Sequence, residues 1–194
     1  MKIERVAALL AGFSLLLMAG VAGYANLGLI EHAATASPGQ LDLAAALMGL
    51  VAALDVIVGL ALFKLFGRPA LLSAASRVLY ATALAVAVAR LAHGTDPIAR
   101  AAAFHQVFDP ALGLFGVHLV LLAFVFDRPQ RWLAVLVGLT GAGYFIDAAA
   151  PLFGHHTQVA TVTFFGELVL MGWLIVAGGR VATEVAPAKQ RLLA

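Results

Sequence analysis

The sequence lacks cysteine and is poor in charged residues. The absence of cysteine excludes a disulfide framework, a thiolate metal site and a cysteine nucleophile. Charged residues make up 11% of the 194 residues, against about 25% in soluble domains. A soluble domain of this size could not cover a composition that is 63% hydrophobic. The composition therefore excludes an ordinary soluble domain and predicts that a lipid bilayer surrounds the chain.

Basic residues and cofactor motifs are also sparse. The pI of about 9.3 comes from 12 Lys and Arg residues that are scattered between apolar runs. They form no basic stripe, so we do not expect nucleic acid as a partner. The sequence contains no Rossmann fingerprint, P-loop, GxSxG elbow or CxxCH haem-attachment motif. The cofactor and the reaction therefore stay unknown at this point.

Long apolar runs are what the sequence has instead. A membrane-spanning helix needs about 20 apolar residues, and six windows fit, approximately 6–30, 42–66, 71–92, 110–126, 132–150 and 159–179. We expect the fourth to extend backward through residues 98–109. These windows predict an all-α polytopic membrane protein, a bundle of six transmembrane helices forming one domain over residues 1–194. Small-residue positions that allow close helix packing are Gly20 with Gly23, Gly113 with Gly116, and Gly138 with Gly141.

The distribution of Lys and Arg predicts the orientation. Positively charged loops stay in the cytoplasm, and one side of the predicted bundle holds Lys2, Arg5, Lys64, Arg68, Arg128, Arg131, Arg180, Lys189 and Arg191, whereas the other holds Arg90 and Arg100. Both termini are therefore expected in the cytoplasm. The first apolar run is longer than the 7–15 residues of a signal-peptide core, so we expect a retained span.

Ionisable residues within the predicted spans are the candidate functional groups, because each is costly in lipid and needs a partner, a wet cavity or a role. Asp55 lies near the middle of the second span, and Arg77 on the third can reach toward it. Ser73, Arg77 and Tyr80 share one helix face by their spacing. The pair either locks two helices together or gives electrostatic support to a site.

Two further carboxyl groups need partners. Thr140, Tyr144 and Asp147 share a face of the fifth span, and Arg90 reaches a similar height, so that Asp147 and Arg90 could pair unless Arg90 extends to the interface. Glu167 has only His118 as a candidate cation at its depth. A buried carboxyl without a cation favours its neutral form, and a neighbouring imidazole would let the two groups share a proton. His118 and Glu167 are thus the candidate catalytic pair, unless His118 simply bonds a backbone carbonyl.

Five histidines fall in or beside the predicted outer loops. His105 and Asp109 are four residues apart and point the same way, as two metal ligands would, and the pair His155 and His156 could add a ligand. No spaced metal motif supports this site. Interfacial histidines without metal are the favoured interpretation.

Several short motifs together resemble a bacterial integral membrane family known as domain of unknown function 4386. They are Ala53-Leu54-Asp55, Ala75-Ser76-Arg77, Phe108-Asp109-Pro110, Gly116-Val117-His118, Gly143-Tyr144-Phe145-Ile146-Asp147 and Gly166-Glu167-Leu168 with Trp173. The resemblance implies a six-helix protein of the bacterial cytoplasmic (inner) membrane. Its polar positions match Asp55, Arg77, Asp109, His118, Tyr144, Asp147 and Glu167, and it supplies no reaction.

Three functions stay open on this evidence. The bundle could bind or convert a small apolar or lipid-like molecule by acid–base chemistry, because small-molecule sites combine apolar walls with a few polar groups. It could be a proton- or ion-coupled transporter, since ionisable residues at mid-depth also mark conduction paths. Alternatively, it could be an accessory subunit that docks a membrane protein partner, with its buried charges specifying helix pairing.

Overall fold

The computed structural model describes residues 3–155 and 157–177. All regular structure in this part of the chain is helical. Six stretches are long and apolar enough to cross a membrane, namely Ile3–Ile30, Gly39–Phe66, Arg68–Ala92, Pro97–Ala123, Arg128–Phe153 and Val159–Val176. The prediction of an all-α protein with six spans is confirmed. Lys2, His156, Arg180, Lys189, Arg191 and the end of the predicted sixth span lie outside the described residues.

The helices follow one another with short connections. In chain order they are α1 (Ile3–Gly23), the π-helix η1 (Tyr24–Ile30), α2 (Pro38–Phe66), the 3-10 turn η2 (Arg68–Ala70), α3 (Leu71–Ala92), α4 (Pro97–Ala123), the 3-10 turn η3 (Arg128–Gln130), α5 (Arg131–Ala149), the 3-10 turn η4 (Ala150–Phe153), α6 (Val159–Thr163) and α7 (Phe165–Val176).

Local capping explains why two helices begin earlier than the apolar windows. Ser37 and Gln40 form a capping box in which each side chain accepts a hydrogen bond from the other residue's backbone N–H, so α2 begins at the next residue after Ser37. Asp96 accepts a hydrogen bond from the backbone N–H of Ile98 at 3.0 Å and so caps α4. As predicted, α4 runs through residues 98–109, and Pro110 lies inside the helix.

The sixth span is interrupted, which the sequence windows did not predict. The break falls at Phe164, between α6 and α7. The α6 segment is held by Asp147, whose carboxylate accepts hydrogen bonds from the backbone N–H groups of Val159 and Ala160. Glu167 consequently lies in the first turn of α7, where the helix dipole favours negative charge.

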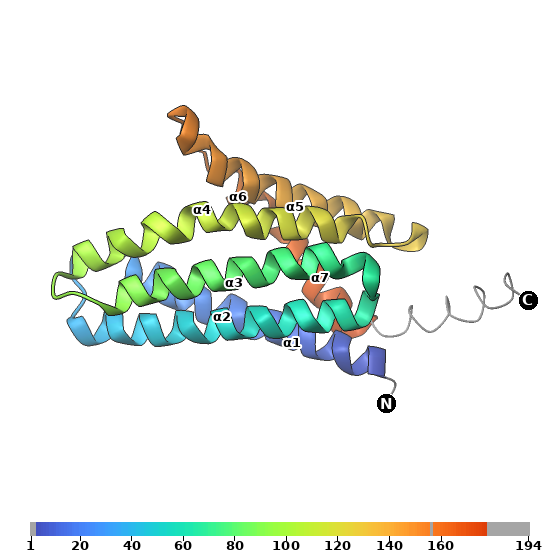
Figure 1. Cartoon of the computed structure of the whole chain (residues 1–194), viewed down its shortest axis with the longest axis horizontal. Helices are drawn as coiled ribbons and strands as arrows, with labels where there is room; N and C mark the ends of the chain where they lie inside the picture. The colour runs from blue at the N-terminus through green and yellow to red at the C-terminus, as the bar shows by residue number, and fades with distance from the viewer. Residues whose placement is uncertain (1–2, 156, 178–194) are drawn as a thin grey trace, which may run out of the picture.

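The spans are arranged as a ring. Each helix packs against its neighbours in the order α1, α2, α3, α4, α5, α7 and back to α1 (Figure 1). The ring closes where Arg5 donates hydrogen bonds to the terminal carbonyls of α7, at 2.5 Å to Ile175 O and 3.4 Å to Leu174 O. We call this the terminal end of the bundle and the opposite end the far end. Both described ends of the chain therefore lie together.

Glycines allow α4 and α5 to cross closely. A Cβ on Gly116 would lie 2.5 Å from Gly141 O, and one on Gly141 would lie 2.6 Å from Gly116 O. Beyond this crossing α5 diverges from α4 toward the far end (Figure 1). Gly113 and Gly138 also contact the facing helix, whereas a Cβ on Gly20 or Gly23 would meet nothing within 4 Å. The expectation that Gly20 and Gly23 pack closely against a helix is wrong.

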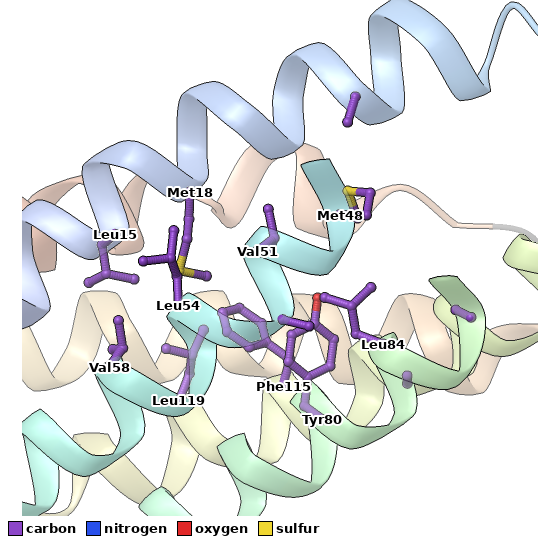
Figure 2. Close-up of a cluster of buried hydrophobic side chains, with 14 of the residues drawn as sticks. Leu15, Met18, Met48, Val51, Leu54, Val58, Tyr80, Leu84, Phe115 and Leu119 are labelled. Atoms are coloured by element: carbon purple, nitrogen blue, oxygen red, sulfur yellow. The ribbon is translucent and has the colours of Figure 1, made fainter. Parts of the chain in front are cut away.

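An apolar core fills the first four helices. Figure 2 shows side chains from four helices meeting in one cluster. Its labelled members are Leu15 and Met18 of α1, Met48, Val51, Leu54 and Val58 of α2, Tyr80 and Leu84 of α3, and Phe115 and Leu119 of α4. The buried charged residues lie beside this cluster, so their surroundings are apolar.

Candidate functional site

An ion pair joins α2 to α3 near the middle of the membrane spans. Arg77 Nη2 lies 2.6 Å from Asp55 Oδ1, and both side chains have an exposed fraction of 0%. The contact is a buried ion pair. Asp55 Oδ2 and Arg77 Nε have no hydrogen-bond partner among the described residues. The pair that was predicted from depth alone is present, with hydrogen-bonding capacity left over.

His118 of α4 continues this network. Its Nε2 lies 3.0 Å from Arg77 Nη1, and its Nδ1 lies 2.9 Å from Ser73 O. Because a guanidinium only donates, Nε2 must accept, which assigns the ring proton to Nδ1 and makes the imidazole neutral. Ser73 Oγ in turn donates to His118 O at 3.1 Å. Asp55, Arg77, His118 and Ser73 form what we call the closed network, which ties three helices together.

Aromatic rings cover the closed network on one side. The guanidinium carbon of Arg77 lies 5.1 Å from the centroid of the Phe115 ring, a cation–π distance. The Phe115 ring also packs against Tyr80, at 5.0 Å between centroids, and against Tyr144, at 5.3 Å. Figure 2 shows the rings of Tyr80 and Phe115 side by side. These rings shield that side of the charges and link α3, α4 and α5.

A cavity of about 130 Å³ lies next to the closed network. Its polar lining consists of Asp55, Arg77, Tyr80 and Glu167. Its apolar lining consists of Leu15, Met18, Ala19, Ala22, Val51, Phe115, Leu168 and Met171. Among the described residues, two carboxyl groups therefore share the cavity with one guanidinium. The volume is close to the roughly 150 Å³ of an engineered cavity that binds benzene, or to the space of about four waters.

Glu167 faces this cavity from α7 with a different partner from the predicted one. Tyr144 Oη donates to Glu167 Oε2 at 3.2 Å, because α5 and α7 are neighbours in the ring. Both ring nitrogens of His118 have partners in the closed network. The structure thus brings Glu167 together with Tyr144 and does not bring it together with His118.

Asp147 and Arg90, which the sequence suggested as a pair, lie in separate places. Asp147 accepts hydrogen bonds from Thr157 Oγ1 at 2.7 Å, Val159 N at 2.9 Å and Ala160 N at 2.7 Å. Arg90 instead lines an open surface depression beside His93. Asp147 fixes the start of α6 and does not take part in the cavity.

Three histidines of the predicted outer loops, His32, His93 and His105, form side-chain hydrogen bonds to nearby residues. His105 Nδ1 lies 3.0 Å from Asp109 Oδ1, and His105 Nε2 lies 3.7 Å from Glu31 Oε1. His155 is exposed, and His156 lies outside the described residues. Within residues 3–155 and 157–177, no group of three His, Cys, Asp or Glu side chains is placed to hold a metal ion.

Three features of the site escaped the sequence interpretation. The hydrogen bond from Tyr144 to Glu167 depends on which helices are neighbours, and a single sequence does not reveal this. The covering role of Phe115 has no signal in a sequence rich in apolar residues. The break at Phe164 has a weak signal in the Thr163 and Gly166 that flank the two phenylalanines.

These features define the class: a multi-pass membrane protein whose helices surround a charged centre. The sequence profile described as Domain of unknown function (DUF4386) matches residues 6–178, and the chain belongs to this family, as its motifs suggested. It is similar to a protein of Archaeoglobus fulgidus described as uncharacterized, with 30% identity over 145 residues that cover 71% of this chain and 85% of that protein. No solved structure matches the chain.

Proposed function

We propose that the protein binds a small molecule with an apolar body and a hydrogen-bond-donating head in the cavity beside Asp55 and Glu167. The observation that carries this proposal is the unpartnered Oδ2 of the fully buried Asp55. A carboxylate oxygen only accepts hydrogen bonds, so its missing partner must be a donor. A buried polar group without a partner destabilises a protein, and a bound donor removes that cost.

The charges of the cavity favour a cationic head. Two carboxyl groups face one guanidinium, and lipid-buried charge is stable only when it is paired. A protonated amine supplies the missing positive charge and donates to either carboxylate. Glu167 is the group we assign to proton exchange with such a head, because its side chain is not part of the ion pair. His118 acts in this proposal by positioning Arg77.

Matched probes test this function. Cyclohexylamine, cyclohexanol and methylcyclohexane share one ring and differ in charge and donor capacity. Calorimetric titration of the purified protein in mild detergent should rank their affinities in that order. Glu167→Gln should weaken cyclohexylamine binding by roughly tenfold or more, because a hydrogen bond to a charged group is lost. Glu31→Gln, which changes an exposed carboxyl outside the cavity, should bind like the unmodified protein.

The proposal is wrong if the three probes bind alike or if Glu167→Gln leaves the amine affinity unchanged. Circular dichroism melts of both variants separate a lost ligand contact from a lost fold.

Proton-coupled transport is a second candidate, favoured by the interrupted sixth span. Discontinuous helices with ionisable groups at mid-depth are typical of transporter sites, and Glu167 lies directly after the break at Phe164. Proteoliposomes that contain a pH-sensitive dye would report proton movement driven by cyclohexylamine. Flux that Glu167→Gln abolishes would support transport. Binding of cyclohexylamine without proton flux would reject transport and support the binding function only.

A further inference from the structure

Helices α1 and α7 are in tight contact near the terminal end. A Cβ on Gly12 would lie 2.6 Å from Ile175 Cγ1 and 3.1 Å from the backbone N of Ile175. Arg5 adds its hydrogen bonds to the last carbonyls of α7. The cavity is therefore closed toward the terminal end between these two helices.

The same two helices separate around the cavity. Ala19 and Leu168 each lie about two helical turns from the Gly12–Ile175 contact. Both residues line the cavity, yet Ala19 is exposed and Leu168 has an exposed fraction of 37%. Ala22 and Met171, which also line it, are half-buried. The cavity thus reaches the outer surface of the ring between α1 and α7, at a place that the small alanine side chains leave open.

The interrupted sixth span keeps this place uncovered. The α6 segment packs chiefly against α5, and α5 diverges from the other helices toward the far end (Figure 1). Val162 of α6 and Phe165 of α7 are themselves strongly exposed. Because α6 makes few contacts with α1, it does not cover the α1 surface around Ala22.

We propose that the ligand enters the cavity sideways from the hydrocarbon of the membrane, through an opening between α1 and α7. This side opening is bounded by Ala19, Ala22, Leu168 and Met171, and the inference rests on the proposed binding function. All four side chains are apolar, so a hydrated ion or sugar would lose its water there without a replacement partner. An apolar body passes at no such cost, and an amine head passes as the neutral base and takes up its proton from Glu167 only inside. The ligand class is therefore a membrane-dissolved amphiphile.

Because the sequence contains no cysteine, an introduced cysteine is the only thiol that a nitroxide spin label can modify. Single nitroxide labels are attached through Ala19→Cys and Ala22→Cys in the full chain, which is then placed in phosphatidylcholine vesicles. Leu16→Cys is the matched control, since Leu16 is exposed on α1 but does not line the cavity. Collision rates are measured with oxygen, which concentrates in hydrocarbon, and with a water-soluble nickel chelate. Cyclohexylamine is then added.

At positions 19 and 22 we expect oxygen collisions to exceed nickel collisions several-fold, and cyclohexylamine to slow nitroxide motion there but not at position 16. Equal access for nickel would show a water-filled entrance and overturn the inference. Protection of positions 19 and 22 from both reagents, as a second copy of the chain on this face would cause, would also overturn it. If calorimetry shows amine binding in that case, the proposed function stands and only the side entry fails. Oxygen access without any amine binding would reject the proposed function, and this inference with it.

Discussion

The two carboxyl groups of the cavity lie in contrasting regions. Asp55, on the side formed by α2, α3 and α4, faces an arginine that is itself held by His118 and covered by Phe115. Glu167, on the side formed by α5 and α7, has one tyrosine hydroxyl as its side-chain partner among the described residues and follows a helix break. Asp55 is fully buried and Glu167 is half-buried, and both have largely apolar surroundings. The two regions differ above all in the partner: Asp55 meets a charged group that other residues hold in place, whereas Glu167 meets a neutral hydroxyl.

The contrast is tested most strongly by Arg77→Met. This change leaves Asp55 as an uncompensated buried charge and removes the donor to His118 Nε2. We expect a loss of about 3–5 kcal/mol in the free energy of unfolding, measured by denaturant titration in mild detergent. Asp55→Leu combined with Arg77→Met removes both charges and should recover most of that loss. If the single variant unfolds like the unmodified protein, the closed network is not a structural lock.

The join between the two regions is the crossing of α4 and α5. Gly116→Ala places a Cβ 2.5 Å from Gly141 O and 2.8 Å from Phe145 N, both backbone atoms that cannot move away easily. Overpacking of this kind should lower the free energy of unfolding by about 1–3 kcal/mol. Gly20→Ala is the control, because its Cβ meets nothing within 4 Å. Equal stability of the two variants in the same titration would contradict the close crossing.

The less constrained side depends on Asp147 for the position of α6. Asp147→Ala removes the acceptor of two backbone N–H groups and one hydroxyl. The free energy of unfolding should fall by about 0.5–2 kcal/mol, the range for a lost helix cap. Hydrogen exchange followed by mass spectrometry should show faster exchange in residues 159–163 and little change in α2 and α3. Asp147→Asn keeps an acceptor and should retain most of the protection; uniform exchange changes across all spans would refute a local role.

The smallest effect is expected for Tyr144→Phe. This variant removes one hydrogen bond to Glu167 at 3.2 Å. We therefore expect the free energy of unfolding to fall by about 0.5–1.5 kcal/mol. Infrared spectra of protein with isotope-labelled glutamate should show a shifted carboxyl band. Tyr24→Phe changes an exposed tyrosine and should leave that band in place. An unshifted band in Tyr144→Phe would mean that the hydroxyl does not bind Glu167.

Depth in the membrane, estimated from sequence position, predicted part of this site. It could not predict which helices are neighbours around the ring. Asp55 and Arg77 were predicted to pair because the long side chain of Arg77 can reach toward the depth of Asp55, and the structure pairs them. Similar depth in the membrane also predicted His118 as the partner of Glu167. The structure instead gives Glu167 a hydrogen bond from Tyr144 of the neighbouring α5. Which helix closes the ring depends on packing between residues far apart in the sequence.

The helix interruption shows the same limit from another direction. Hydropathy predicted a span over 159–179, since the composition stays apolar on both sides of Phe164. The backbone nevertheless leaves the regular α-helix there, because Thr140 Oγ1 of α5 donates to Thr163 O and the Glu167 N–H bonds to Phe164 O. A window average cannot register a partner that arrives from another span. For the same reason, similar depth alone predicted a pair between Arg90 and Asp147, which the structure places apart.

The contact between Arg5 and the end of α7 has a consequence for biosynthesis. The ribosome makes α1 before α7, and the two helices dock on each other, so the ring cannot close until α7 has been translated. Until then Gly12 and the Arg5 guanidinium lack their contacts with α7, and α1 packs in the membrane against α2 alone. A nascent chain truncated before α7 should therefore remain a protease-sensitive assembly of inserted but undocked helices.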